Sequence, residues 1–266
     1  MTSLRPFTPE EMALNTQIAE FTMKVARPLI WHNSQENWPK RLSGGTCFIL
    51  RFDGGLIGIT ANHVVETFEE ACKQESQLGC LLRTTPFDLL GAIIDRDAEL
   101  DIATFSVTED QLIGSEAVAI DCRLEWPSPM PDKNTALSLA GFPEELKKLS
   151  PRSNVEFRAY VNMCFVEDVT SNDIIATYEP RRDIRVRAAS EFPDLGANLS
   201  GCSGGPVLIH IERNGCHRWF PVGIIVGGPG EDPTGAMAEF DIIRIRRINA
   251  VRHDGTIIRR SQTIAV

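Results

Sequence analysis

Residues 201–206, which read Gly-Cys-Ser-Gly-Gly-Pro, have the composition of a turn that exposes a reactive serine. Their glycines permit backbone conformations that a side chain would forbid, so the chain can turn tightly around Ser203 before the apolar run 207–209. Such a turn can aim two or three backbone N–H groups at one point, where they stabilise a tetrahedral oxyanion. The chemistry indicated is acyl transfer at Ser203, although a small-residue cluster taken alone is more often an ordinary loop.

A histidine and an aspartate upstream supply the partners that a nucleophilic serine needs. His63 follows the apolar run 57–61, and Asp101 stands at the mouth of the apolar run 102–105. A histidine can take the proton of the serine as a general base, and a buried carboxylate can hold the imidazole in the required tautomer. A lone histidine beside apolar residues is usually a packing residue. The order His, Asp, Ser along one chain therefore carries more weight than any member does.

Three segments resemble the motifs of the chymotrypsin/trypsin-like serine proteases, and most closely those of the HtrA-like bacterial branch. They read Thr-Ala-Asn-His-Val-Val at 60–65, Asp-Ile-Ala at 101–103 and Gly-Cys-Ser-Gly-Gly-Pro at 201–206. The segment 44–50 resembles the strand that opens the first barrel of that family, with Cys47 where a glycine is usual. The resemblance spans roughly residues 42–256 and implies an all-β fold of two antiparallel six-stranded β-barrels with the active site in the cleft between them.

The resemblance also implies a role for each site residue. Ser203 would be the nucleophile, His63 the general base and then acid, and Asp101 the group that orients the imidazole. The N–H groups of Gly201 and Ser203 would form the oxyanion hole. No cofactor and no metal is implied.

Two further carboxylates compete with Asp101 for the orienting role. Asp95 and Asp97 lie in the same acidic segment, residues 95–101. Asp101 is preferred because it matches the Asp-Ile-Ala motif and directly precedes the apolar run. We expect Asp95 and Asp97 to be solvated loop charges.

The substrate pocket implied by the resemblance has two walls. Ala197, with Asn198 beside it, would lie at the base of the pocket, and Val226, Gly227 and Gly228 would form the other wall. No carboxylate is offered for a lysine or arginine side chain, so a small or medium apolar residue is the expected preference. The paired glycines would leave room for an extended substrate to add as a strand.

Cysteine and histidine usage bears on regulation and metals. Where the digestive members of the family carry an aspartate before the serine, this chain has Cys202, so activation by a freshly cleaved N-terminus is not expected. A thiol there could serve redox control, but a buried small thiol is the commoner case. The seven cysteines lack any C-x-x-C pair, which favours reduced thiols. None of the five histidines has metal-ligand spacing, and Cys216-His217 is interpreted as a hairpin end.

Composition bounds localisation and partners. The first residues lack the basic start and apolar run of a secretory signal, and no stretch of about 18 apolar residues occurs, so a cytoplasmic protein without a membrane anchor is expected. The net charge of −9 argues against nucleic acid. Solvated faces are the default explanation for the arginines; the alternative is a protein or anionic partner at the Arg-rich C-terminal segment, defined by Arg244, Arg246, Arg247, Arg252, Arg259 and Arg260. An earlier cluster comprises Arg181, Arg182, Arg185 and Arg187.

Three units follow from the pattern along the chain. Residues 1–40 form an N-terminal segment, in which Thr8 and Pro9 have the types of a helix start and predict a helix to about residue 26. Residues 41–125 would form the first barrel with His63 and Asp101. Residues 126–266 would begin with a proline-rich linker and form the second barrel with Ser203 and the pocket. The helix would pack on the barrels; the sharper hypothesis is that it docks a regulatory partner or restrains the site.

The function predicted is therefore a serine endopeptidase that cleaves peptide bonds through an acyl-enzyme, with activation from a latent state by a partner or ligand as a further hypothesis. The alternative from another class is a protease-fold module that binds extended peptides without cutting them. An esterase acting on small acyl compounds would use the same residues.

Overall fold

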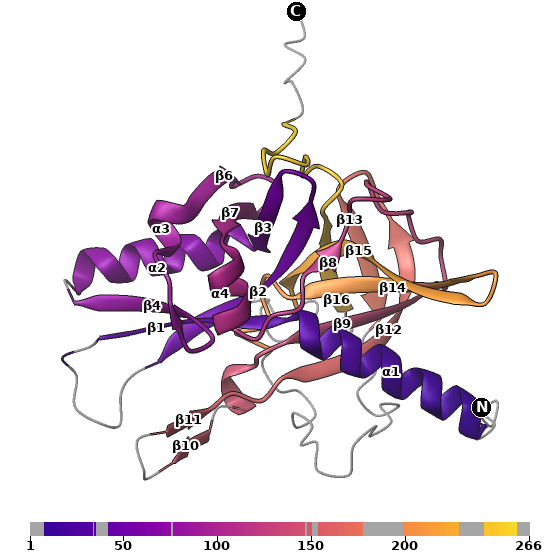
Figure 1. The fold of residues 1–266 in the computed structure, drawn as a ribbon, viewed down its shortest axis with the longest axis horizontal. Helices are drawn as coiled ribbons and strands as arrows, with labels where there is room; N and C mark the ends of the chain where they lie inside the picture. Colours follow the sequence, from indigo (N-terminus) through magenta and orange to yellow (C-terminus); the bar gives the residue numbers. More distant parts are fainter. Residues whose placement is uncertain are drawn as a thin grey trace, which may run out of the picture.

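The computed structural model of the chain describes residues 8–33, 35, 42–75, 77–146, 148–150, 154–177, 199–228 and 242–259. Strands dominate the described part, and they form an eight-stranded sheet followed by a closed barrel (Figure 1). The prediction of a mainly β chain with an N-terminal helix is thus confirmed.

The first sheet has the strand order β5-β4-β1-β2-β3-β7-β6, and β8 pairs with β2. All pairings are antiparallel except that of β2 with β8. Its strands are β1 (Arg27–Asn33), β2 (Ser43–Phe52), β3 (Gly55–Thr60), β4 (Leu78–Leu82), β5 (Thr85–Pro86), β6 (Ile93–Asp97), β7 (Ile102–Val107) and β8 (Ile120–Asp121).

The expected closure of this first sheet into a six-stranded barrel is not seen among the described strands, where β5 and β6 remain as edges. Strand β5 is two residues long and ends at Pro86, which has no N–H to continue a ladder. Helices α2 (Asn62–Gln74) and α3 (Leu89–Ala92) also pack against β7. A short helix, α4 (Glu109–Gly114), follows β7.

The second half is a closed antiparallel barrel with the order β12-β13-β16-β15-β14-β9. This agrees with the predicted second barrel of six strands. Its strands are β9 (Ala136–Gly141), β12 (Tyr160–Val169), β13 (Asp173–Thr177), β14 (Pro206–Arg213), β15 (Cys216–Gly227) and β16 (Ile242–Arg247). A 3-10 turn, η1 (Glu144–Leu146), and a small hairpin of β10 (Lys148–Ser150) and β11 (Asn154–Glu156) connect β9 to β12.

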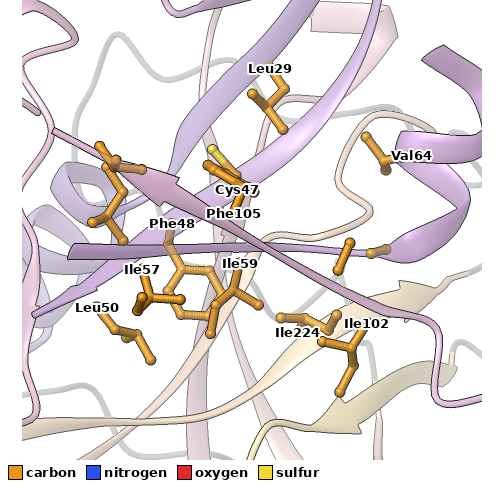
Figure 2. Packing of buried hydrophobic residues seen from close by; sticks show 14 of the residues in the cluster. Leu29, Cys47, Phe48, Leu50, Ile57, Ile59, Val64, Ile102, Phe105 and Ile224 are labelled. Atoms are coloured by element: carbon orange, nitrogen blue, oxygen red, sulfur yellow. The ribbon is translucent and has the colours of Figure 1, made fainter. Parts of the chain in front are cut away.

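The two halves share an apolar interface. Phe48 and Phe105 fill the first sheet, and Gly58 faces the Phe105 ring so closely that any Cβ there would overlap it. Figure 2 shows Ile224 of the barrel beside Ile102 of the sheet, and both are fully buried. Burial of this continuous apolar surface fixes the orientation of the halves, because separating them would return it to water.

Helix α1 (Pro9–Val25) lies along the outside of the barrel, against β9, β12 and β14 (Figure 1). Thr8 closes a capping box with Glu11, which satisfies backbone groups at the first turn. The buried Thr22 hydroxyl donates to Ser138 Oγ on β9 (2.9 Å), and Phe21 stacks on Trp219 at 4.7 Å between ring centroids. Packing on the barrel, one of the two expectations for this helix, is what the structure has. No helix among the described residues is long and apolar enough to cross a membrane.

Candidate functional site

Asp101 binds His63 at two points. Oδ2 of Asp101 lies 2.8 Å from Nδ1 of the imidazole, and Oδ1 accepts the backbone N–H of His63 at 2.9 Å. The two contacts fix both the ring and its backbone. Because a carboxylate only accepts hydrogen bonds, Nδ1 carries the proton and Nε2 of the neutral imidazole is the nitrogen that can accept one.

The backbone at Asp101 adopts a conformation that few residues with a side chain use. Its φ is +53°, and its carbonyl accepts the N–H of Asn62, the first residue of α2, at 3.2 Å. Aspartate tolerates this left-handed region better than most residues, but the conformation still has to be held by its surroundings. The short turn between β6 and β7 thereby delivers the carboxylate to the start of α2.

The turn that carries Ser203 is fixed to β15. The N–H of Gly204 donates to the carbonyl of Ile225 (2.8 Å), and the N–H of Ile225 donates to the carbonyl of Gly205 (3.0 Å). Ser203 itself is 7% exposed. These hydrogen bonds fix the turn, and they hold Ser203 just before the start of β14.

The same turn meets the start of helix α2. A Cβ on Gly204, whose φ is +82°, would overlap the Thr46 carbonyl and the Thr60 hydroxyl and lie 2.8 Å from the Ala61 nitrogen. Ala61 is the N-cap of α2, two residues before His63. The structure thus brings the serine turn, the histidine and the aspartate into one region at the junction of the two halves.

The backbone at Gly201, one of the two predicted oxyanion-hole residues, has a conformation that favours glycine. Gly201 has a φ of +93°, and a Cβ there would lie 2.5 Å from the Phe142 carbonyl oxygen, so only glycine fits. The Ser200 carbonyl accepts the N–H of Glu144 at 2.8 Å, and a trans peptide then directs the Gly201 N–H to the opposite side. Within the described residues, neither the Gly201 nor the Ser203 N–H donates to another protein group.

Thr46 of β2 is a residue of the candidate site whose role was not predicted from the sequence. Its N–H donates to the Ser203 carbonyl (2.9 Å), and its hydroxyl donates to the Gly201 carbonyl (2.6 Å). The same hydroxyl accepts the Phe142 N–H at 3.1 Å. Thr46 lies in the motif 44–50, so the signal was present, but only the fold shows that this strand supports the serine turn.

Asp95 and Asp97 are not solvated loop charges, which corrects the sequence expectation. Their side chains are 17% and 12% exposed, and both pair with Arg259 of the C-terminal segment. Oδ2 of Asp95 also accepts the backbone N–H of Ile257 at 2.8 Å. The Arg259 guanidinium holds the pKa of the Asp95 carboxyl below its usual range. Its hydrogen bond lowers this pKa more than the backbone hydrogen bonds do.

Arg96 links this acidic segment to the start of α2. Its Nε donates to Asn62 Oδ1 (2.9 Å) and its Nη1 donates to Glu69 Oε1 (2.6 Å). Asn62 is 2% exposed and directly precedes His63. Arg96 thus holds the side chain of Asn62 in place, next to the candidate general base His63.

The expected pocket residues are partly described. Val226 is 4% exposed and lies at an irregularity in the pairing of β15 with β16, and Gly227 pairs with Arg244. The side of Gly228 that would carry a Cβ faces Leu199, whose own Cβ lies 3.7 Å from that position. Ala197 and Asn198 lie outside the described residues.

The residue before the serine is buried. Cys202 is 1% exposed, its N–H donates to the Leu199 carbonyl (2.9 Å), and its sulfur lies against Gly141 of β9. All seven cysteines are free thiols. Among the described residues, no group of three or more His, Cys, Asp or Glu side chains is arranged to hold a metal ion.

Several of the C-terminal arginines have partners inside the protein. Arg246 Nε lies 3.0 Å from Asp173 Oδ1, and Arg247 donates to the carbonyls of Thr170 (2.7 Å) and Ser171 (2.9 Å). Together with the Arg259 pairs, these contacts favour a structural role for this part of the Arg-rich segment. Arg260 and the cluster at 181–187 lie outside the described residues.

Comparison with known proteins gives little beyond this geometry. No protein-family model matches the chain, and no curated protein matches it. A solved structure, a serine endoprotease from Yersinia pestis, is similar over 92% of this chain with a TM-score of 0.48 and 14% sequence identity. The alignment covers 64% of that protein, so the chain spans about two thirds of its length at most. A likeness at this level defines no family.

Proposed function

We propose that the chain is a serine endopeptidase in which Ser203, His63 and Asp101 form a catalytic triad. The observation that carries the proposal is the pair of contacts from Asp101 to the backbone N–H and Nδ1 of His63. The contact with Nδ1 fixes the imidazole tautomer in which Nε2 can act as a base. Ser203 lies on a glycine turn that meets the start of the same helix. These are the parts that acyl transfer requires.

In the proposed mechanism, Ser203 Oγ attacks the carbonyl carbon of the scissile peptide while His63 Nε2 takes the hydroxyl proton. The carbonyl oxygen becomes an oxyanion, which the N–H groups of Gly201 and Ser203 stabilise. The C–N bond then breaks, and His63 returns the proton to the leaving amine. A water molecule attacks the acyl-enzyme with His63 again as base, which releases the acid and restores Ser203.

Asp101 contributes orientation and charge. It accepts from Nδ1 throughout and stabilises the imidazolium that forms when Nε2 is protonated. No cofactor takes part in this scheme, and every proton transfer runs between Ser203, His63, the substrate and water.

Peptide substrates are favoured by the shape of the neighbouring strand. Val226 and Gly227 end β15 and Gly228 follows it, and glycines at 227 and 228 would allow an extended chain to approach the backbone. We extend the proposal to a small or medium apolar residue at the cleaved bond. Regulation by a partner at α1 or at the Arg-rich segment is not part of the proposal, since α1 packs on the barrel and Arg259 pairs with Asp95.

The test is labelling with a fluorophosphonate, read by intact mass and peptide mapping. Wild-type protein should gain one label on Ser203, and Ser203→Ala should gain none. Ser200→Ala, which removes the other serine of the same turn, is the matched control and should label. Unlabelled wild-type protein that cleaves casein, and loses this activity once Ser203 is labelled, is identified as a peptidase, whereas hydrolysis of nitrophenyl esters alone identifies an esterase. Folded wild-type protein that takes no label would instead support the non-cutting peptide-binding module.

A further inference from the structure

Two histidines that are seven residues apart in the sequence meet on the β14–β15 hairpin. His210 Nε2 lies 2.9 Å from His217 Nδ1, and the two rings are nearly parallel with their centroids 4.9 Å apart. The expectation that no histidine has metal-ligand spacing considered neighbours along the chain, whereas these two are neighbours across a hairpin.

The hairpin holds the pair in place. Its turn, Asn214-Gly215, has φ values of +55° and +75°, as a tight two-residue hairpin turn requires. The register pairs His210 with Trp219 and Glu212 with His217. Because cross-strand partners share a face of the ladder, both imidazoles and the Glu212 carboxylate project from the same side.

The chemistry of the two nitrogens fits a shared cation. A neutral imidazole has one N–H and one bare nitrogen, so at 2.9 Å the pair holds one proton between its two facing atoms. Burial, and then the charge of His217, lower the pKa of His210. His217 is exposed and His210 is half-buried, so water can complete a coordination sphere.

We propose that His210 and His217 form a binding site for a divalent transition-metal ion that prefers imidazole nitrogen, with Zn²⁺ as the test ion. At a Zn–N distance of about 2.0–2.1 Å, tetrahedral ligands stand about 3.3 Å apart, so the two nitrogens must separate by a few tenths of an ångström and both rings must turn until their lone pairs converge on the ion. Glu212 is placed to become a third ligand by side-chain rotation. The site does not depend on the proposed peptidase function.

A bound metal ion would stabilise the hairpin at the place where Trp219 contacts helix α1. Trp219 lies 5.3 Å from His210 between ring centroids, and it also stacks on Phe21 of α1. A ligand that binds only the folded protein raises its stability by mass action. Zn²⁺ should therefore raise the melting temperature of the full chain.

The experiment is calorimetric titration of the chelator-treated full chain with ZnCl₂ at pH 7.5. We expect one ion per chain, with affinity reduced at least about tenfold in both His210→Gln and His217→Gln. His253→Gln removes another exposed imidazole that stacks on an aromatic ring, Phe52, and should bind as the wild type does. Cys216→Ser, which removes the exposed thiol next to His217, should also leave binding unchanged.

Wild-type protein supplies a test that needs no variant. Because metal binding to imidazole competes with protons, Zn²⁺ binding and the rise in melting temperature should both weaken at pH 5. Absence of binding at pH 7.5, binding that survives in both histidine variants, or binding lost in Cys216→Ser would overturn the proposal.

Discussion

The hydroxyl of Thr46 donates to the carbonyl of Gly201 at 2.6 Å, which ties the first sheet to the turn that carries Ser203. Thr46 is fully buried, and its hydroxyl also accepts the N–H of Phe142. Thr46→Val keeps the shape of the side chain but leaves both backbone groups without this partner. We expect it to lower the free energy of unfolding by about 1–3 kcal/mol.

The same substitution should slow fluorophosphonate labelling by roughly 10- to 100-fold, because small displacements of a catalytic group have large effects on rate. Thr177→Val is the matched control: it also removes a strand hydroxyl that contacts a carbonyl, here that of Phe165 at 3.4 Å, but on the surface of the barrel. Equal labelling rates in the two variants would show that Thr46 does not support the serine turn.

Alanine substitutions at Gly201 and Gly215 distinguish the effect of backbone strain from the loss of an oxyanion-hole donor. Both have positive φ values, +93° and +75°, but a Cβ on Gly215 meets nothing within 4 Å, whereas on Gly201 it would crowd the Phe142 carbonyl. Gly215→Ala should lower stability by about 1 kcal/mol and label normally. Gly201→Ala should lose more stability and label at least about 100-fold more slowly. Chemical denaturation and labelling kinetics measure the two effects, and normal labelling of Gly201→Ala would remove Gly201 from the proposed hole.

Arg96 is expected to be a positioning residue for His63. Arg96→Gln loses the fork that binds Asn62 and Glu69, so the start of α2 should be less well held. We expect labelling to slow by roughly 3- to 10-fold, with a shifted or broadened downfield NMR signal of the His63 Nδ1 proton. Arg123→Gln, which removes a local surface pair with Asp121, is the control and should change neither. An unchanged proton signal in Arg96→Gln would make the residue merely structural.

The sequence predicted the parts of the site that come from short motifs. His63, Asp101 and the glycine turn around Ser203 were expected from residue types and chain order; the structure has the contact of Asp101 with His63, and the catalytic roles stay predictions. The helix at Pro9–Val25 followed from its capping residues. These features depend on local geometry, which a few neighbouring residues determine.

The rest depends on contacts between distant segments. Asp95 looks like a loop charge until the fold brings Arg259 to it from 164 residues away. The meeting of His210 with His217 requires the register of a hairpin, and the open edge of the first sheet depends on where β5 ends. No local pattern contains this information, because the free energy of each contact is set by the packing of the whole chain.

Thiol chemistry offers a last test that is independent of catalysis. Burial raises the pKa of the Cys80 and Cys122 thiols to about 12, while Cys216 is exposed. Folded protein treated with iodoacetamide at pH 8 should therefore be alkylated at Cys216 and protected at both buried positions, as read by mass spectrometry. Above about pH 9 the unfolded chain releases these protons and the folded chain keeps them, so stability should fall between pH 9 and 12 by at most about 1.4 kcal/mol per pH unit for each thiol. Denaturation curves at pH 8 and 10 should show this loss, and Cys122→Ala, despite its cavity, should show a smaller one over the same interval. Rapid alkylation of Cys80 at pH 8 would contradict the burial on which the prediction rests.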